Sequence, residues 1–239
     1  MIKEIIEKLD ELRSLDKYCL LFGADRHQYH LGEKLTEENI VCIEDHFKIS
    51  LPLHYREFLL NVGNGGAGPG FGINAIGNLE VGSASGCSCY SSSMTKDDWM
   101  KHLELHAKGF SEKYHRYASS CWEEPCNFSK EFKLVDNIVH EDENIPEEDE
   151  EYTKWEKKAE EEYLLVGNYR IAGYGCNQTA SLILTGPSKG LVWYTDWETN
   201  SMYNSEHDFI QWYLNWLNYS LNDVEERYVR FEREGSFWP

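Results

Sequence analysis

The sequence predicts an α+β fold, a single domain with an antiparallel or mixed sheet flanked by N-terminal helices and a C-terminal aromatic helix. Apolar residues recur with helical period in residues 2–62 and again in residues 205–234. Between them, residues 163–194 contain short β-branched or aromatic runs separated by turn residues, and successive short turns imply antiparallel pairing. The chain has 239 residues, 41% of them hydrophobic, which suffices for one sizeable core. We therefore expect one domain over residues 1–239.

Three helices are predicted in the N-terminal third of the chain. The first covers residues 2–12, whose isoleucines and leucines form one apolar stripe. The second begins after Thr36, whose side chain can cap the free amides of the first turn, and runs to about Phe47. The third carries Pro52 in its first turn, because proline has no amide to leave unpaired there. Its buried face is expected to include Tyr55 and Phe58.

The glycine-rich stretch NVGNGGAGPGFG, residues 61–72, is either a phosphate-binding loop or the end of a helix. A phosphate-binding P-loop follows a strand and ends in Gly-Lys-Ser/Thr. Here a helix comes first, and residues 64–79 contain no basic side chain. The sequence therefore favours a helix end, with Gly65 and Gly66 accepting a left-handed capping conformation. A tight turn and a strand at about residues 71–76 are expected to follow.

Strands are predicted at residues 163–167, 170–173, 179–184 and 190–194, the last of which contains Trp193. Ser205 is then expected to cap a helix, because Asp208 three residues later completes a capping-box pattern. The aromatic face of this helix, with Trp212 and Trp216, should cover the sheet. A separate charged helix is expected over residues 222–234. The prediction for the core is the burial of a set of aromatic side chains: Tyr55, Phe58, Trp193, Trp212 and Trp216.

Charge limits the classes of partner. The chain has 42 acidic and 23 basic side chains, a formal charge of −19. Such a polyanion repels nucleic acid and anionic membranes at long range, so a basic macromolecular partner is expected. The N-terminal stretch MIKEIIEKLDEL contains acids within its apolar pattern and is read as neither a signal peptide nor a membrane span. Residues 141–162 are mostly acidic, and their preferred interpretation is a solvated loop.

Neither a metal nor a cofactor is expected. The seven cysteines lack the dense spacing of a secreted disulfide scaffold, which favours a reducing cytoplasm. Cys87-x-Cys89 and Cys121-x4-Cys126 offer four thiolates, but C-x-C is a poor chelating spacing for zinc, and incidental thiols are the preferred interpretation. His102 and His106 do not form an H-E-x-x-H motif, and we expect them on a solvated helix face.

Several motifs in order along the chain are similar to those of the SUKH superfamily, which includes fungal regulators of cell-wall synthesis and bacterial immunity proteins. The first motif is Leu51-Pro52-x-x-Tyr55-Arg56-x-Phe58-Leu59, followed by Asn64-Gly65-Gly66-Ala67-Gly68-Pro69-Gly70-Phe71-Gly72. The second half matches in Gly173-Tyr174-Gly175-Cys176, Leu182 to Pro187, Gly190-Leu191-Val192-Trp193, and the helix from Phe209 to Leu217. The resemblance covers residues 35–79 and 160–217, about half of the chain. Residues 81–127 depart from the pattern as an insertion.

The resemblance implies a domain without catalytic chemistry that binds a protein partner. Bacterial members neutralise a toxin, often a nuclease, and a basic toxin would suit the acidic charge of this chain. The alternative is a regulator or scaffold for another cytosolic protein, as in the fungal relatives. An enzyme is disfavoured because no Ser, Cys or His stands in a recognisable nucleophile pattern. The chain is expected to be a monomer or weak oligomer. The acids expected to contact the partner are Glu147, Glu148, Asp149, Glu150, Asp196 and Glu198.

Overall fold

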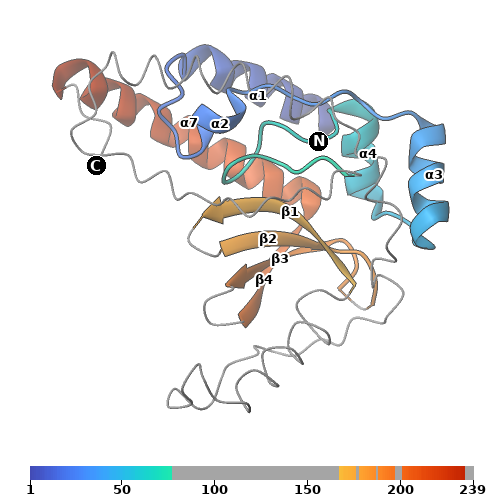
Figure 1. The fold of residues 1–239 in the computed structure, drawn as a ribbon. Helices are drawn as coiled ribbons and strands as arrows, with labels where there is room; N and C mark the ends of the chain where they lie inside the picture. Colours follow the sequence, from blue (N-terminus) through green and yellow to red (C-terminus); the bar gives the residue numbers. More distant parts are fainter. Residues whose placement is uncertain (77–166, 176–177, 187, 197–200, 235–239) are drawn as a thin grey trace, which may run out of the picture.

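The computed structural model describes residues 1–76, 167–175, 178–186, 188–196 and 201–234. In this part of the chain, helices pack against a four-stranded antiparallel sheet, and the C-terminal helix is rich in aromatic residues (Figure 1). The α+β prediction is therefore confirmed. The helices are α1 (Ile2–Leu15), α2 (Ala24–His27), α3 (Glu37–Phe47), α4 (Leu53–Asn61) and α7 (Phe209–Glu234).

The sheet follows chain order, β1-β2-β3-β4, as a meander. Its strands are β1 (Asn168–Gly175), β2 (Gln178–Ile183), β3 (Leu191–Asp196) and β4 (Ser201–Asp208). Ala172, Ala180, Tyr194 and Tyr203 are aligned across the four strands and share one face. This is the face on which α7 lies, because the Trp212 indole N–H donates to the Tyr194 hydroxyl at 3.0 Å.

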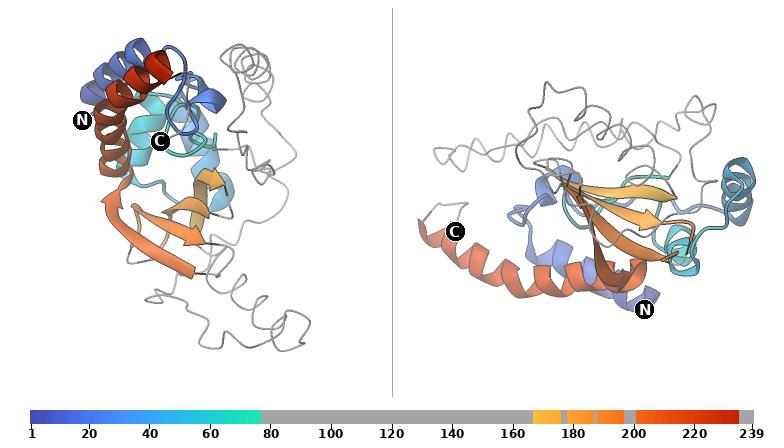
Figure 2. Two further views of the ribbon diagram at one scale, coloured as in Figure 1. Left: turned by 90° about the vertical axis from the view of Figure 1, so that its left-hand side faces the viewer. Right: turned by 90° about the horizontal axis from the view of Figure 1, so that it is seen from below.

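The core joins α1, α4, α7 and the sheet. Tyr55 and Phe58 from α4 contact Phe209 at the start of α7, with ring centroids 4.8 and 5.0 Å apart, and Phe58 also contacts Tyr213. These four rings are fully buried. Figure 2 shows α1 and α7 side by side. In the predicted stripe of α1, Ile5, Leu9 and Leu12 are buried, whereas Ile6 is 39% exposed and lies off the buried face.

The predicted burial of the other aromatic residues holds with one correction. Trp193 is 4% exposed and Trp212 is 3% exposed. Trp216 is only partly buried, and it packs against the core from the edge. It lies one turn beyond Trp212 on α7, where its ring contacts Tyr213 at a centroid distance of 5.2 Å.

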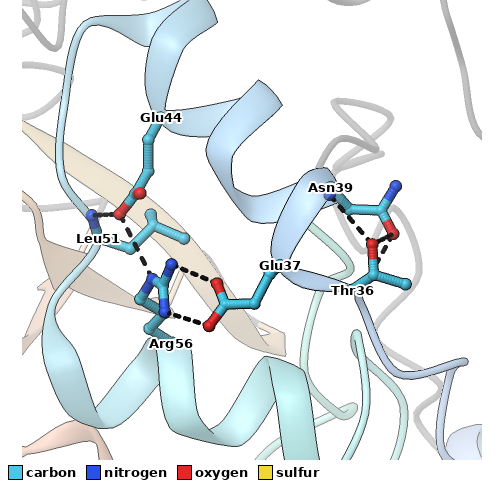
Figure 3. Close-up of polar contacts among 6 residues, drawn as sticks. All are labelled: Thr36, Glu37, Asn39, Glu44, Leu51 and Arg56. Carbon is cyan, nitrogen blue, oxygen red and sulfur yellow. Dashed lines mark hydrogen bonds and ion pairs between the residues drawn. The ribbon is translucent and has the colours of Figure 1, made fainter.

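Helices α3 and α4 are connected by polar contacts around the first predicted family motif (Figure 3). Thr36 caps α3 as predicted, in a reciprocal capping box with Asn39. The Arg56 guanidinium on α4 forms a two-pronged ion pair with the Glu37 carboxylate, whose Nη1–Oε1 distance is 2.9 Å. Glu44 accepts the Leu51 N–H at 2.7 Å, which fixes the connection between the two helices.

The glycine stretch packs against other backbone instead of forming an anion cradle. The amide of Gly66 donates to Ile73, that of Ala67 to His30, and that of Phe71 to Gly173. A Cβ on Gly66, whose φ is +100°, would lie 2.3 Å from the His30 carbonyl oxygen. Glycine is therefore required here for close approach of two chain segments, and these amides are already occupied.

Five sequence expectations need correction. Pro52 precedes α4 as its N-cap, one residue earlier than expected, and α4 ends at Asn61 with Val62 in right-handed geometry. Gly65 and Gly66 do have positive φ, but they lie beyond the helix end. Residues 71–76 form no strand: Ile73 makes isolated bridges to Gly66 and to Ala172, and the Phe71 and Asn74 amides donate to Gly173 and Ile171 of β1 without a continuous ladder. The remaining two corrections concern Ser205 and the C-terminal helix.

Ser205 does not cap a helix, because it lies within β4. Its hydroxyl donates to the Val192 carbonyl of β3 at 2.6 Å. The capping box lies three residues later, where Asp208 accepts the Gln211 N–H at 3.0 Å and the Gln211 side chain accepts the Asp208 N–H at 3.4 Å. From there α7 runs unbroken to Glu234, so the charged helix expected at residues 222–234 is its second half.

Candidate functional site

A groove of about 430 Å³ lies between the first half of α7, the sheet and two loops. We call it the α7 groove. Most of its lining side chains are aromatic or apolar, and they come from chain segments that are far apart in sequence. Its lining includes Leu21, Phe22, Pro69, Tyr174, Tyr194, Ser205, His207, Trp212, Asn215, Trp216, Tyr219, Asp223 and Arg227.

The sheet contributes two tyrosines to the groove. A β-bulge in β1 adds one residue opposite β2 near Tyr174, so that the ring of Tyr174 reaches across the small Ala180 to Tyr194. The two ring centroids are 5.8 Å apart, and the rings are arranged edge to face. Tyr203 continues the row on β4, 5.2 Å from Tyr194. The alanine in β2 therefore makes room for a row of three tyrosines.

The hydroxyls of Tyr174 and Tyr203 stay neutral. Burial, and then the neighbouring Tyr194, raise the pKa of Tyr174 far above its usual value. The pKa of Tyr203 is also raised, first by burial and then by Tyr194 and Asp196. The Trp212 N–H is bound by the Tyr194 oxygen, and the row presents ring faces and phenol oxygens to the groove.

The two sides of the groove carry aromatic rings, and one ring on each side is more than half exposed. Helix α7 supplies Trp212, Trp216 and Tyr219, which share one face of the helix by their spacing of three and four residues. Tyr219 is 70% exposed. Opposite, Phe22 is 56% exposed and contacts Phe71, with ring centroids 5.4 Å apart. Exposed aromatic rings on both sides of a groove are typical of a protein-binding surface.

The loop that carries Phe22 is held by a buried carboxyl group. Asp16 accepts the Leu20 N–H at 2.7 Å, the Leu21 N–H at 3.2 Å and the Tyr29 hydroxyl at 2.6 Å. Burial raises the pKa of Asp16, although these hydrogen bonds oppose the shift. Asp16 is 1% exposed and has a structural task, so it is not a candidate acid or base of the groove.

His27 is the second buried titratable group near the groove. Its ring lies edge-on to Tyr29 and to Trp216, at centroid distances of 5.2 and 6.0 Å. Its Nδ1 accepts the Tyr29 N–H at 3.1 Å, so this nitrogen carries no proton in the folded protein. Burial lowers the pKa of His27 to about 4, and the nearby Asp25 opposes this only in part. The imidazole is therefore neutral, and it packs against Trp216, which lines the groove.

Of the acids predicted to contact a partner, Asp196 is the one that the structure places. It ends β3, in register with Ser201, on the same face as Tyr194 and Tyr203. It therefore lies next to the tyrosine row, two residues along β3 from Tyr194. Glu147, Glu148, Asp149, Glu150 and Glu198 lie outside the described residues, as do the insertion at residues 81–127 and the acidic stretch at residues 141–162.

Sequence reasoning assigned Trp212 and Trp216 to the core and missed the groove beside them. One signal was present in the sequence. Helix α7 has two aromatic stripes, one through Phe209 and Tyr213, and a second through Trp212, Trp216 and Tyr219. A globular helix needs only one buried stripe, so the second indicates an additional contact surface. The other residues that line the groove with this stripe are residues 21–22, 69–70, 174 and 194. They are far apart in sequence, so no local pattern predicts that they lie together.

Within the described residues, no three His, Cys, Asp or Glu side chains gather as a metal site. The expected cysteine and histidine pairs at residues 87–89, 102–106 and 121–126 lie outside that part of the chain. Among the described helices, none combines the length and apolar character needed to cross a bilayer. Comparison of the chain with protein-family models, with curated proteins and with solved structures finds no match.

Proposed function

We propose that this chain is a non-catalytic immunity protein that binds and neutralises a basic toxin, of the nuclease type, in the cytoplasm. The observation that carries the proposal is the formal charge of −19 on 239 residues. A nuclease presents a positive surface to its nucleic acid, so a polyanionic protein is drawn to the same surface and competes with the substrate. Complementary charge of this kind raises association rates to about 10⁸–10⁹ M⁻¹ s⁻¹.

Two features of the described residues support a binding role. The α7 groove is open and carries half-exposed aromatic side chains, which are the residue types enriched at protein interfaces. The buried titratable groups beside it, Asp16 and His27, are engaged in holding the loop and the helix wall. The groove therefore resembles a contact surface more than a reaction centre.

The similarity to the SUKH superfamily supports the same proposal. In the first motif, Tyr55 and Phe58 pack against Phe209, and Arg56 pairs with Glu37. These motif residues have structural tasks, as expected of a family that keeps a scaffold and varies its binding surface.

The partner is identified by capture. The tagged full-length chain is incubated at low salt with lysate of its native host, and proteins released by 1 M salt are identified by mass spectrometry. We expect a basic protein with nuclease activity, which this chain inhibits when the two are mixed. Recovery of only neutral or acidic cytosolic proteins would favour the regulator or scaffold alternative and would contradict the immunity proposal.

Association kinetics with the captured protein then test the charge argument. Replacing Glu147, Glu148, Asp149 and Glu150 by Gln or Asn should slow association about tenfold at low salt, and have little effect at 1 M salt, where the Debye length is about 3 Å. The matched control neutralises four exposed acids of α1, namely Glu4, Glu7, Asp10 and Glu11. If association slows only in the first variant, residues 147–150 contact the partner. If it slows equally in both variants, the overall charge of the chain attracts the partner. No slowing in either variant would refute recognition by charge.

Replacing Asp196 by Asn and Glu198 by Gln tests a different step. If these two acids lie in the desolvated centre of the complex, their loss speeds dissociation and leaves association nearly unchanged. An unchanged dissociation rate would remove Asp196 and Glu198 from the proposed contact.

A further inference from the structure

We propose, on the basis of the function proposed above, that the α7 groove is the place where the basic partner inserts a cationic side chain, an arginine or a lysine. The proposal names the ligand chemistry of the groove: a guanidinium or ammonium group held against aromatic faces. It depends on three properties of the groove, which are its ring geometry, its polar atoms and the charges around it.

The ring geometry suits a cation. The rings of Tyr174 and Tyr194 meet nearly edge to face, and Tyr194 and Tyr203 are inclined by 30°. Trp216 and Tyr219 on α7 face the same groove. The faces of Trp and Tyr rings carry negative electrostatic potential, and they attract Lys and Arg side chains within about 6 Å. A groove lined by several such rings therefore provides more than one face to the same cation.

The polar atoms of the tyrosine row favour a donor ligand. The Trp212 N–H is already bound by the Tyr194 hydroxyl, so this indole is not free to bind an anion. Phenol oxygens have two lone pairs each, and Arg and Lys side chains are donors without acceptors. Because the pKa of Tyr174 is raised, its hydroxyl stays protonated and adds no negative charge that would have to be desolvated.

The surrounding charges favour a cation over an anion. In the lining, Arg227 forms an ion pair with Asp223, so its positive charge is compensated. Asp196 lies two residues after Tyr194 on β3, on the same sheet face, and Glu206, which follows the lining residue Ser205, is exposed. The chain as a whole carries −19. The volume of about 430 Å³ is near the lower end of ligand pockets and suits a side chain or short peptide segment.

The experiment uses an arginine–glycine repeat peptide as the probe and the same peptide with citrulline in place of arginine as the uncharged control. Binding to the full chain is measured by calorimetry and by the NMR shifts of tryptophan indole N–H groups. The groove variants are Phe22→Ala and Tyr219→Ala, whose side chains are more than half exposed, so the fold should tolerate them. The matched control is Val229→Ala, also exposed on α7 but outside the groove lining.

We expect the arginine peptide to bind at least about tenfold more tightly than the citrulline peptide, and each groove variant to weaken it about tenfold. Val229→Ala should leave the affinity unchanged. Equal affinity for both peptides would overturn the proposal, because the charge would then be irrelevant. Equal affinity of groove variants and control would overturn it too, because the peptide would then bind to acids elsewhere on the surface.

The same variants separate this inference from the proposed function. If the wild-type chain captures a basic toxin and the groove variants capture it equally well, the groove assignment is wrong and the immunity function stands. If no basic protein is captured but the groove binds the arginine peptide as expected, the cation site stands and the immunity proposal fails.

Discussion

The stability of this protein should fall as the pH drops below about 6.5, because of His27. In the unfolded chain a histidine has a pKa of about 6.5. In the folded protein, burial lowers the pKa of His27 to about 4. Between these two values the unfolded state binds a proton that the folded state does not, so protonation favours unfolding. The contribution of His27 is fully present above pH 6.5 and is lost progressively toward pH 4.

The magnitude follows from the two pKa values. Each unit of pKa difference corresponds to about 1.4 kcal/mol, so the full loss approaches about 3.5 kcal/mol. At pH 5.5, one unit below the unfolded pKa, about 1.4 kcal/mol should be lost relative to pH 7.5. We choose pH 5.5 as the lowest pH of the experiment because the isoelectric point is about 4.8. Near that pH the chain loses the net charge that keeps its molecules apart.

Urea unfolding followed by tryptophan fluorescence at pH 7.5, 6.5 and 5.5 measures the effect, with His27→Gln as the control. Glutamine does not titrate, and its side-chain oxygen can accept the Tyr29 N–H that His27 Nδ1 now accepts. Asp16 titrates in the opposite sense, since its raised pKa adds stability as the pH falls, but it does so in both proteins. The difference between the two proteins should therefore shrink by about 1.4 kcal/mol from pH 7.5 to 5.5. A constant difference would refute the burial of a neutral His27.

Two further changes test the packing of the core and the glycine stretch. Gly66→Val should lower the free energy of unfolding by at least about 3 kcal/mol, because φ is +100° and a Cβ would lie 2.3 Å from the His30 carbonyl oxygen. Thermal melts measure this loss. Stabilisation of the protein by ATP would contradict the assignment of these amides to backbone partners. Trp212→Ala should cost about 3–5 kcal/mol in urea unfolding, because the indole is 3% exposed and binds Tyr194; a loss below about 1 kcal/mol would show that the ring does not belong to the core.

Local signals predicted the N-terminal helices well and the connections between elements poorly. The Thr36 cap and the apolar stripe of α1 depend on neighbours within a few residues. The cap is confirmed, and the stripe is buried at Ile5, Leu9 and Leu12 but not at Ile6. Strand β4 was missed because its sequence, SMYNSEHD, is polar and has no alternation. Its pairing with β3 and the burial of Met202 decide its conformation. Ser205 and Asp208 both fit a helix cap, and only the pairing of β4 selects Asp208.

The candidate site was even less accessible to sequence reasoning, since it is a product of tertiary structure. Phe22, Tyr174 and Tyr219 come from a loop, a strand and a helix, and each alone is an ordinary aromatic residue. What brings them together is the glycine stretch, where close backbone contacts hold the loop of residues 21–32 against the sheet. The sequence indicated that these glycines had no phosphate to bind, and the structure adds that they position one side of the groove.

The groove is therefore held by buried polar residues as well as by apolar packing. Tyr29 accepts, with its backbone carbonyl, a hydrogen bond of 2.6 Å from Arg13 of α1, and it donates its hydroxyl to Asp16. Its φ of +58° is unusual for a bulky residue, and Cys19, in the connection between α1 and α2, has a φ of +50°. Such backbone strain persists only where surrounding contacts determine the conformation. Those contacts fix Leu21 beside Phe22 at one wall of the α7 groove, and His27 contacts Trp216 at the other. The fold therefore accepts a cost in local stability at the place where it holds both walls of the groove.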